Sequence, residues 1–164
     1  MKIPVVNEKD EVIGYKERAN IDSTKDIVRS ASLWITNSRG DILLAQRKFT
    51  KQNNPGKWSE AVGGTVEGND SYESTMLRET REEIGLSVDT YEIGPKQYVD
   101  SPTRYFVQWY ITTVDKPIEA FQPQVEELEQ LAWVSKEQFI EELRNSPEKY
   151  IDEMQAIARL FITS

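Results

Sequence analysis

Residues 63–86 place a pair of glycines directly before a stretch with helical spacing that ends at another glycine. Leu77 and Ile84 are seven residues apart and share one stripe of such a helix, which would seat it on a hydrophobic core. Gly85 follows at the position where a left-handed residue commonly ends a helix. The sequence therefore predicts a tight turn and a core-packed helix over residues 71–84, around which the remaining strands must be arranged.

Three carboxylates, Glu79, Glu82 and Glu83, occupy a second stripe of this helix. At about 100° per residue, positions i, i+3 and i+4 fall close enough for the side chains to converge on one point. Like charges at these spacings cost on the order of 0.2–0.5 kcal/mol per pair, and the helix C-terminus favours cations instead. A solvated acidic face is one interpretation. The other is a divalent cation, and hard oxygen ligands suit Mg²⁺ or Mn²⁺.

The segment resembles the signature of the Nudix hydrolases. That pattern is glycine, five residues, glutamate, seven residues, arginine–glutamate, an apolar residue, any residue, two glutamates, any residue, glycine and an apolar residue. The positions that match in register are Gly64, Arg78, Glu79, Glu82, Glu83, Gly85 and Leu86. Asp70 stands where the family has glutamate, and Thr80 stands where it has an aliphatic residue. The shorter Asp70 puts its contacts in doubt, whereas Thr80 affects only a packing contact.

The resemblance implies an α/β fold, a Nudix-type α/β/α sandwich with a mixed β-sheet. Mixed strands with helices on both faces favour the same architecture. One domain is expected over residues 1–164, in which residues 63–86 carry the signature. Residues 1–27 resemble an N-terminal hairpin extension of the branch that includes isopentenyl-diphosphate isomerase. The expected strands are 3–6, 11–16, 28–36, 42–47, 58–62, 89–99, 104–114 and 129–134, and the expected helices are 71–84, 135–144 and 147–163.

The resemblance also implies a Mg²⁺-dependent hydrolase that cleaves the diphosphate linkage of a nucleoside diphosphate derivative or of a nucleoside di- or triphosphate. Divalent cations suit this reaction because they neutralise the phosphate oxygens and activate water. Arg78 is expected to orient one carboxylate, and Asp70 to act as an outer metal group. The metal ligands implied by the family are the carbonyl of Gly63 and the carboxylates of Glu79, Glu82 and Glu83, of which Glu82 and Glu83 are also expected to be required for catalysis.

Glu83 and Glu127 are the two candidates for the general base. Glu127 precedes segment 128–134, which resembles a part of the family in which an acidic residue approaches the metals. It also lies in an acid-rich loop with Glu119, Glu126 and Glu129. A surface residue with no catalytic role is therefore the alternative interpretation of Glu127.

Basic residues gather just before the glycine pair, at Arg47, Lys48, Lys51 and Lys57. A solvated loop is one interpretation, and the other is that Arg47 and Lys57 hold a pyrophosphate against the metals. Gly64 is expected to allow backbone to approach phosphate closely, because it has no Cβ. Trp58 is the aromatic residue that we would test first for stacking on a nucleobase, although core packing is the commoner role of such residues.

Two other functions compete with hydrolysis. A non-catalytic nucleotide-binding sensor would keep the fold, but it would have little need for all three carboxylates. An isopentenyl-diphosphate isomerase of this type needs a cysteine acid/base group and histidine metal ligands, and the sequence contains neither Cys nor His.

Composition narrows the partners. The net charge of −8 argues against DNA or RNA as a bulk partner, since non-specific binding depends on Lys and Arg. No apolar run approaches about 18 residues, the first residues lack the apolar stretch of a signal peptide, and there is no cysteine for disulfides. We therefore expect a cytoplasmic protein with a small-molecule substrate and no membrane partner. Members of the family often pair as homodimers, and the sequence leaves the oligomeric state open.

Overall fold

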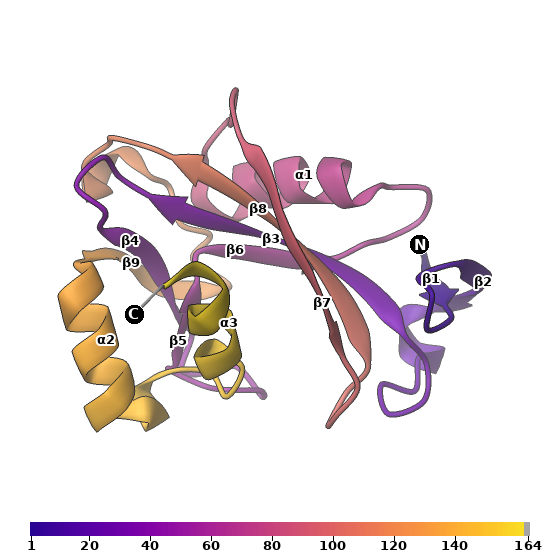
Figure 1. The fold of residues 1–164 in the computed structure, drawn as a ribbon. Coiled ribbons are helices and arrows are strands. Elements are labelled where there is room, and N and C mark those ends of the chain that lie inside the picture. The colour runs from indigo at the N-terminus through magenta and orange to yellow at the C-terminus, as the bar shows by residue number, and fades with distance from the viewer. Residues whose placement is uncertain (163–164) are drawn as a thin grey trace.

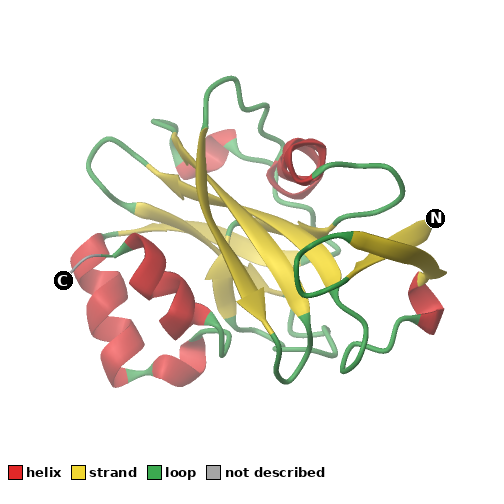
Figure 2. Ribbon diagram, turned by 45° about the vertical axis from the view of Figure 1, so that its right-hand side comes forward, coloured by secondary structure: helices red, strands yellow, loops and turns green. Residues whose placement is uncertain are grey.

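The computed structural model describes residues 1–162 and shows a mixed sheet with helices on both faces (Figures 1 and 2). Strands β3 and β8 run parallel, whereas the other pairs are antiparallel. Helix α1 (Tyr72–Ile84) covers one face, and helices α2 (Lys136–Asn145) and α3 (Met154–Phe161) cover the other. The predicted α/β/α sandwich is confirmed.

The strand order is β5 (Trp58–Glu60), β4 (Ile42–Arg47), β3 (Val28–Thr36), β8 (Tyr105–Thr113) and β7 (Glu92–Val99), with β6 (Val62–Thr65) paired to β3 and β9 (Leu128–Val134) paired to β4.

Strand β3 lies at the centre of the sheet, and its side chains alternate between two cores. Leu33 and Ile35 belong to the core beneath α1, which also contains Met76 of that helix. Trp34 points to the opposite face and joins the core beneath α2 and α3, with Phe139. Because successive side chains of a strand face opposite ways, one apolar strand can serve both layers.

Helix α1 begins and ends where the sequence predicts. The Ser71 hydroxyl accepts from the Ser74 N–H, and the Ser74 hydroxyl accepts from the Ser71 N–H, which makes a reciprocal N-terminal cap. Gly85 ends the helix in the left-handed conformation at φ 68°. Thr80 is fully buried, and its hydroxyl donates to the Met76 carbonyl at 2.7 Å. The polar Thr80 is therefore accommodated without an unpaired hydroxyl.

The N-terminal residues form a separate two-stranded sheet of β1 (Lys2–Val6) and β2 (Val12–Glu17), followed by a short 3-10 turn, η1 (Arg18–Asn20). Asp10, in the turn between the strands, accepts from Arg29 at 2.7 Å, Lys96 at 2.7 Å and Tyr72 at 2.8 Å. The hairpin predicted at 3–6 and 11–16 is present, and Asp10 joins it to the sheet and to α1.

The helix predicted over 147–163 is wrong at its start. Residues Pro147–Lys149 form only a short 3-10 turn, η3, and α3 begins at Met154. A similar turn, η2 (Ile118–Ala120), precedes β9. Tyr150 instead forms a parallel bridge with Trp58, and the Ile151 N–H donates to the Trp58 carbonyl at 3.1 Å. Pairing with β5 therefore replaces the first helical turns, and residue 163 lies outside the described residues.

The expected strand 58–62 is likewise divided into β5 and β6 around Ala61. Across residues 1–162, no helix combines the length and the apolar character needed to cross a lipid bilayer.

Candidate active site

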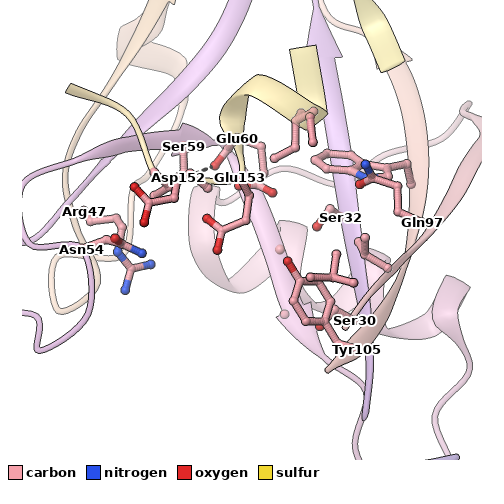
Figure 3. A pocket seen from close by; sticks show the side chains of 18 of the residues that line it. Ser30, Ser32, Arg47, Asn54, Ser59, Glu60, Gln97, Tyr105, Asp152 and Glu153 are labelled. Atoms are coloured by element: carbon pink, nitrogen blue, oxygen red, sulfur yellow. Dashed lines mark hydrogen bonds between the residues drawn. The ribbon is translucent and has the colours of Figure 1, made fainter. Parts of the chain in front are cut away.

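A cavity of about 530 Å³ opens beside the glycine pair, between one face of the sheet and the start of α3 (Figure 3). Arg47 and Asn54 lie at one edge of the view, Gln97 lies at the other, and the side chain of Glu153 lies between them. The displaced start of α3 thus brings an acidic residue to the cavity. Within the described part of the chain, the charged lining consists of one basic residue, Arg47, and five acidic ones: Glu60, Glu83, Glu127, Asp152 and Glu153.

The carboxyl groups of Glu79 and Glu83 contact each other beside the glycine pair. Burial raises the pKa of Glu83, the charge of Glu79 raises it further, and the Gly63 N–H, which donates to Glu83 Oε2 at 3.2 Å, opposes the rise. Burial also raises the pKa of Glu79, against the charge of Arg78. Two carboxyl groups this close cannot both ionise cheaply, so a proton or a cation must compensate them.

Gly64 has no room for a side chain. A Cβ at this position would lie 2.5 Å from the carboxyl carbon of Glu79 and 2.7 Å from its Oε1. The glycine therefore permits the backbone of β6 to pass directly against the carboxylate. Hard oxygens beside such a cradle have the donor chemistry that Mg²⁺ or Mn²⁺ prefers, so these residues fit the metal implied by the sequence.

Glu82 does not join this pair in the structure. Its side chain is 54% exposed and lies 3.8 Å from an Arg78 nitrogen. Residues four apart on a helix are neighbours, so Glu79 meets Glu83 while Glu82 turns towards Arg78. Among residues 1–162, no group of three or more acidic, Cys or His side chains is already arranged around one metal position. Convergence of all three carboxylates remains a prediction for the metal-bound protein.

Arg78 links Asp70, in the loop before α1, to Glu79 on the helix. Its Nη1 donates to Glu79 at 3.0 Å, and its Nη2 donates to Asp70 at 3.2 Å. The guanidinium therefore contacts a carboxylate of the candidate metal site, and its orienting role stays a prediction. Asp70 reaches Arg78 despite its shorter side chain.

Glu60 is a site residue that sequence reasoning missed. Burial raises its pKa to about 7, and a hydrogen bond from Ser32 opposes the rise. Glu60 lies next to the glycine pair, since a Cβ on Gly63 would be 3.8 Å from Glu60 Oε2. The sequence did contain a signal for Glu60, since it is the one carboxylate among the small or apolar residues of 59–62. An ionisable group in a buried strand is unusual and therefore points to a functional site.

The predicted substrate contacts and the candidate base Glu127 divide into two groups. Arg47 lines the cavity, and its Nε and Nη2 donate to the Asn53 carbonyl at 3.1 and 2.9 Å. Glu127 also lines it and forms an ion pair with Lys51.

Lys57 and Trp58 are not among the residues that line the cavity. Lys57 lies just outside it, 3.8 Å from Asp152 of the lining, and Trp58 packs against the core beneath α2 and α3. The structure therefore does not bring these two residues into the cavity. Pairing of β5 with β4 and with Tyr150 fixes Trp58 on that side.

Comparison with known proteins places this geometry in context. A family model described as NUDIX domain matches residues 26–154. The chain is 28% identical over 159 residues to an uncharacterised Nudix hydrolase of Pseudomonas aeruginosa, covering 96% of this chain and 90% of that protein. It is 26% identical over 152 residues to an isopentenyl-diphosphate Delta-isomerase of Serratia proteamaculans, covering 89% and 83% of the two proteins. The crystal structure of DR0079 from Deinococcus radiodurans superposes with a TM-score of 0.81 at 23% identity, covering 98% and 99% of the two chains.

Proposed function

The chain belongs to the Nudix family, and from that premise we propose that it hydrolyses a diphosphate linkage in a nucleoside diphosphate derivative or in a nucleoside di- or triphosphate, with Mg²⁺ or Mn²⁺. The observation that carries this proposal is the Glu79–Glu83 pair, held against the glycine backbone beside a cavity of about 530 Å³. We propose that residues 1–164 act as one domain, with 1–27 as an extension.

The charge of the cavity supports the use of cations. Among residues 1–162, five acidic side chains and one basic side chain line it, so the protein without a cation would repel an anionic diphosphate. Glu79, Glu83 and the Gly63 carbonyl would hold the cation, with Glu82 joining them after a side-chain rotation. The bound metal would neutralise phosphate charge and lower the pKa of a coordinated water.

The protein's own residues orient the reacting groups. The Gly63 N–H and Arg78 fix Glu83 and Glu79, respectively. Arg47 is anchored to Asn53 through Nε and Nη2, which leaves Nη1 to donate to a phosphate oxygen. Glu83 and Glu127 remain the two candidates for the general base. Since Glu127 is paired with Lys51, it must leave that pair to accept a proton.

The test is release of a nucleoside monophosphate or inorganic phosphate from a panel of nucleotide sugars, dinucleoside polyphosphates and nucleoside di- and triphosphates. We expect turnover with Mg²⁺ and a loss of at least about 100-fold in Glu83→Gln. Glu141→Gln, at an exposed position of α2, changes the same charge away from the cavity and should retain activity. Nucleotide binding without turnover across the panel would support the sensor instead.

A further inference from the structure

We propose that Gln97 selects the part of the substrate beyond the diphosphate by donating hydrogen bonds to an acceptor on it. This inference rests on the proposed function and adds to it the residue that sets specificity: Gln97 would favour a diphosphate whose attached group carries a carbonyl oxygen or ring nitrogen, as a nucleoside does. A purely hydrocarbon group, such as a short isoprenoid, lacks such an acceptor. The observations that carry the proposal lie at the end of the cavity opposite Arg47 (Figure 3).

This end of the cavity is one face of three adjacent strands. Ser32 of β3 pairs with Trp109 of β8, and Val107 of β8 pairs with Gln97 of β7. These side chains share a face because alternate residues of a strand point the same way, and all four line the cavity.

Ser32 also pairs with Gly63 on its other side. From β6 through β3 and β8 to β7 there are three strand spacings, or about 14 Å. A substrate that contacts both the glycine pair and Gln97 must therefore extend well beyond its diphosphate.

A buried indole fixes the orientation of the Gln97 amide. Trp109 is 1% exposed, and its Nε1–H donates to Gln97 Oε1 at 2.9 Å. An indole nitrogen can only donate, so the amide must present its oxygen to Trp109. The Nε2 group then lies on the other side of the amide carbon.

The two Nε2 hydrogens have no acceptor among residues 1–162, although Gln97 is partly buried and lines the cavity. Val99, Val107 and Ile157 supply apolar surface around the same space. The result is a donor pair beside apolar side chains, a combination by which small-molecule sites achieve both affinity and specificity.

A bound group with an acceptor satisfies these donors, whereas a hydrocarbon group strips water from them and leaves them unpaired. Such a loss discriminates between ligands more strongly than a change in apolar contact. We therefore expect the protein to prefer nucleotide-type diphosphates over dimethylallyl diphosphate.

The experiment uses Gln97→Glu in the full chain. The substituted carboxylate can still accept from Trp109, but it has no hydrogen to donate. With UDP-glucose or ADP-ribose, whichever is turned over faster, kcat/KM should fall about 10- to 100-fold, mainly through KM. Dimethylallyl diphosphate, whose singly esterified diphosphate is more negative than the doubly esterified ones of these nucleotides, has no such acceptor and should change by less than about twofold. Gln130→Glu, at an exposed position of β9, adds the same charge outside the cavity and should leave both activities unchanged.

Gln97→Leu provides a second readout, since removal of both donors should also narrow the preference for the nucleotide over dimethylallyl diphosphate. Equal losses on both compounds, or a native preference for dimethylallyl diphosphate, would overturn the inference. If the native protein turns over none of the compounds, the proposed hydrolase function is wrong, and the role of Gln97 in binding is tested by itself. Calorimetric dissociation constants of ADP-ribose for the native protein and Gln97→Glu then decide the role of Gln97.

Discussion

The two ends of the cavity are built in different ways. At the diphosphate end, the glycine pair and the α1 carboxylates lie within 63–86, one continuous stretch of sequence. At the far end, Gln97 and Trp109 meet Ser32 only through the pairing of β7, β8 and β3. The first end depends on local turn and helix geometry, whereas the second depends on strand register. Substitutions at the two ends should therefore affect different properties: turnover of every diphosphate at the first, and choice among them at the second.

Gly64→Ala should give the largest effect. The new Cβ would lie 2.5 Å from the Glu79 carboxyl carbon, so the carboxylate or the β6 backbone must move. A displacement of about 1 Å at a catalytic group can cost on the order of 100-fold, and we expect at least that loss in kcat/KM on every substrate. Gly14→Ala is the matched control, because a Cβ there meets nothing within 4 Å. Retained activity in Gly64→Ala would show that the close approach is not needed.

Arg78→Lys should have the next largest effect. A lysine cannot donate in two fixed directions, so it cannot hold Glu79 and Asp70 together as Arg78 does. Loss of a group that orients metal ligands typically costs about 10- to 100-fold in metal affinity or activity. Titration with Mn²⁺, followed by its effect on water relaxation, would measure the affinity directly. An unchanged Mn²⁺ affinity would contradict this role for Arg78.

The contrast between local geometry and strand register also explains how much of the fold and of the site could be predicted from the sequence. The caps Ser71 and Gly85 and the alternation of apolar residues are local signals, so the sequence predicts α1, the signature and the sandwich. The contact between Glu79 and Glu83 also follows from helical spacing alone.

Long-range pairing was not accessible from the sequence. Pairing of Tyr150 with Trp58 replaces the first part of the expected helix 147–163 and holds Trp58 against the core beneath α2 and α3. The contact of Gln97 with Trp109 depends on a register shift in β7 between Ile93 and Lys96. Such shifts alter which side chains meet across strands, and Gly94-Pro95 in the sequence lies at this one. A glycine–proline pair marks an irregular strand, but it does not say which cross-strand partners result.

Glu60 lies beside the glycine pair, and its effect should appear in stability. Because burial raises its pKa from 4.5 to about 7, the folded protein binds more protons than the unfolded chain between these values. The free energy of unfolding therefore falls as pH rises from about 4.5 to 7, and this loss persists above pH 7. Glu60→Gln should raise the free energy of unfolding by about 1–3 kcal/mol at pH 8 and leave it nearly unchanged at pH 4. Urea denaturation without metal at both pH values measures the free energy of unfolding. Equal effects of the substitution at pH 4 and pH 8 would exclude titration of Glu60 as the cause.

Trp109→Phe should produce the smallest effect on activity and the sharpest test of the far end. Phenylalanine keeps an aromatic ring in the core but removes the N–H that orients Gln97, so the amide can turn and present its oxygen to the substrate. We expect a loss of about 3- to 10-fold in kcat/KM on nucleotide substrates, since the donors remain available part of the time. Hydrolysis of dimethylallyl diphosphate should not change.

Unfolding should become easier by about 1–3 kcal/mol in Trp109→Phe because the smaller ring leaves a void. A loss of stability lowers activity on every substrate by the same factor, so it cannot by itself change the preference between substrates. If the variant lowers activity on nucleotides and on dimethylallyl diphosphate by the same factor, Trp109 acts only through packing. A drop confined to nucleotides assigns it to orientation of Gln97, which would make substrate choice at this end of the cavity a consequence of strand register.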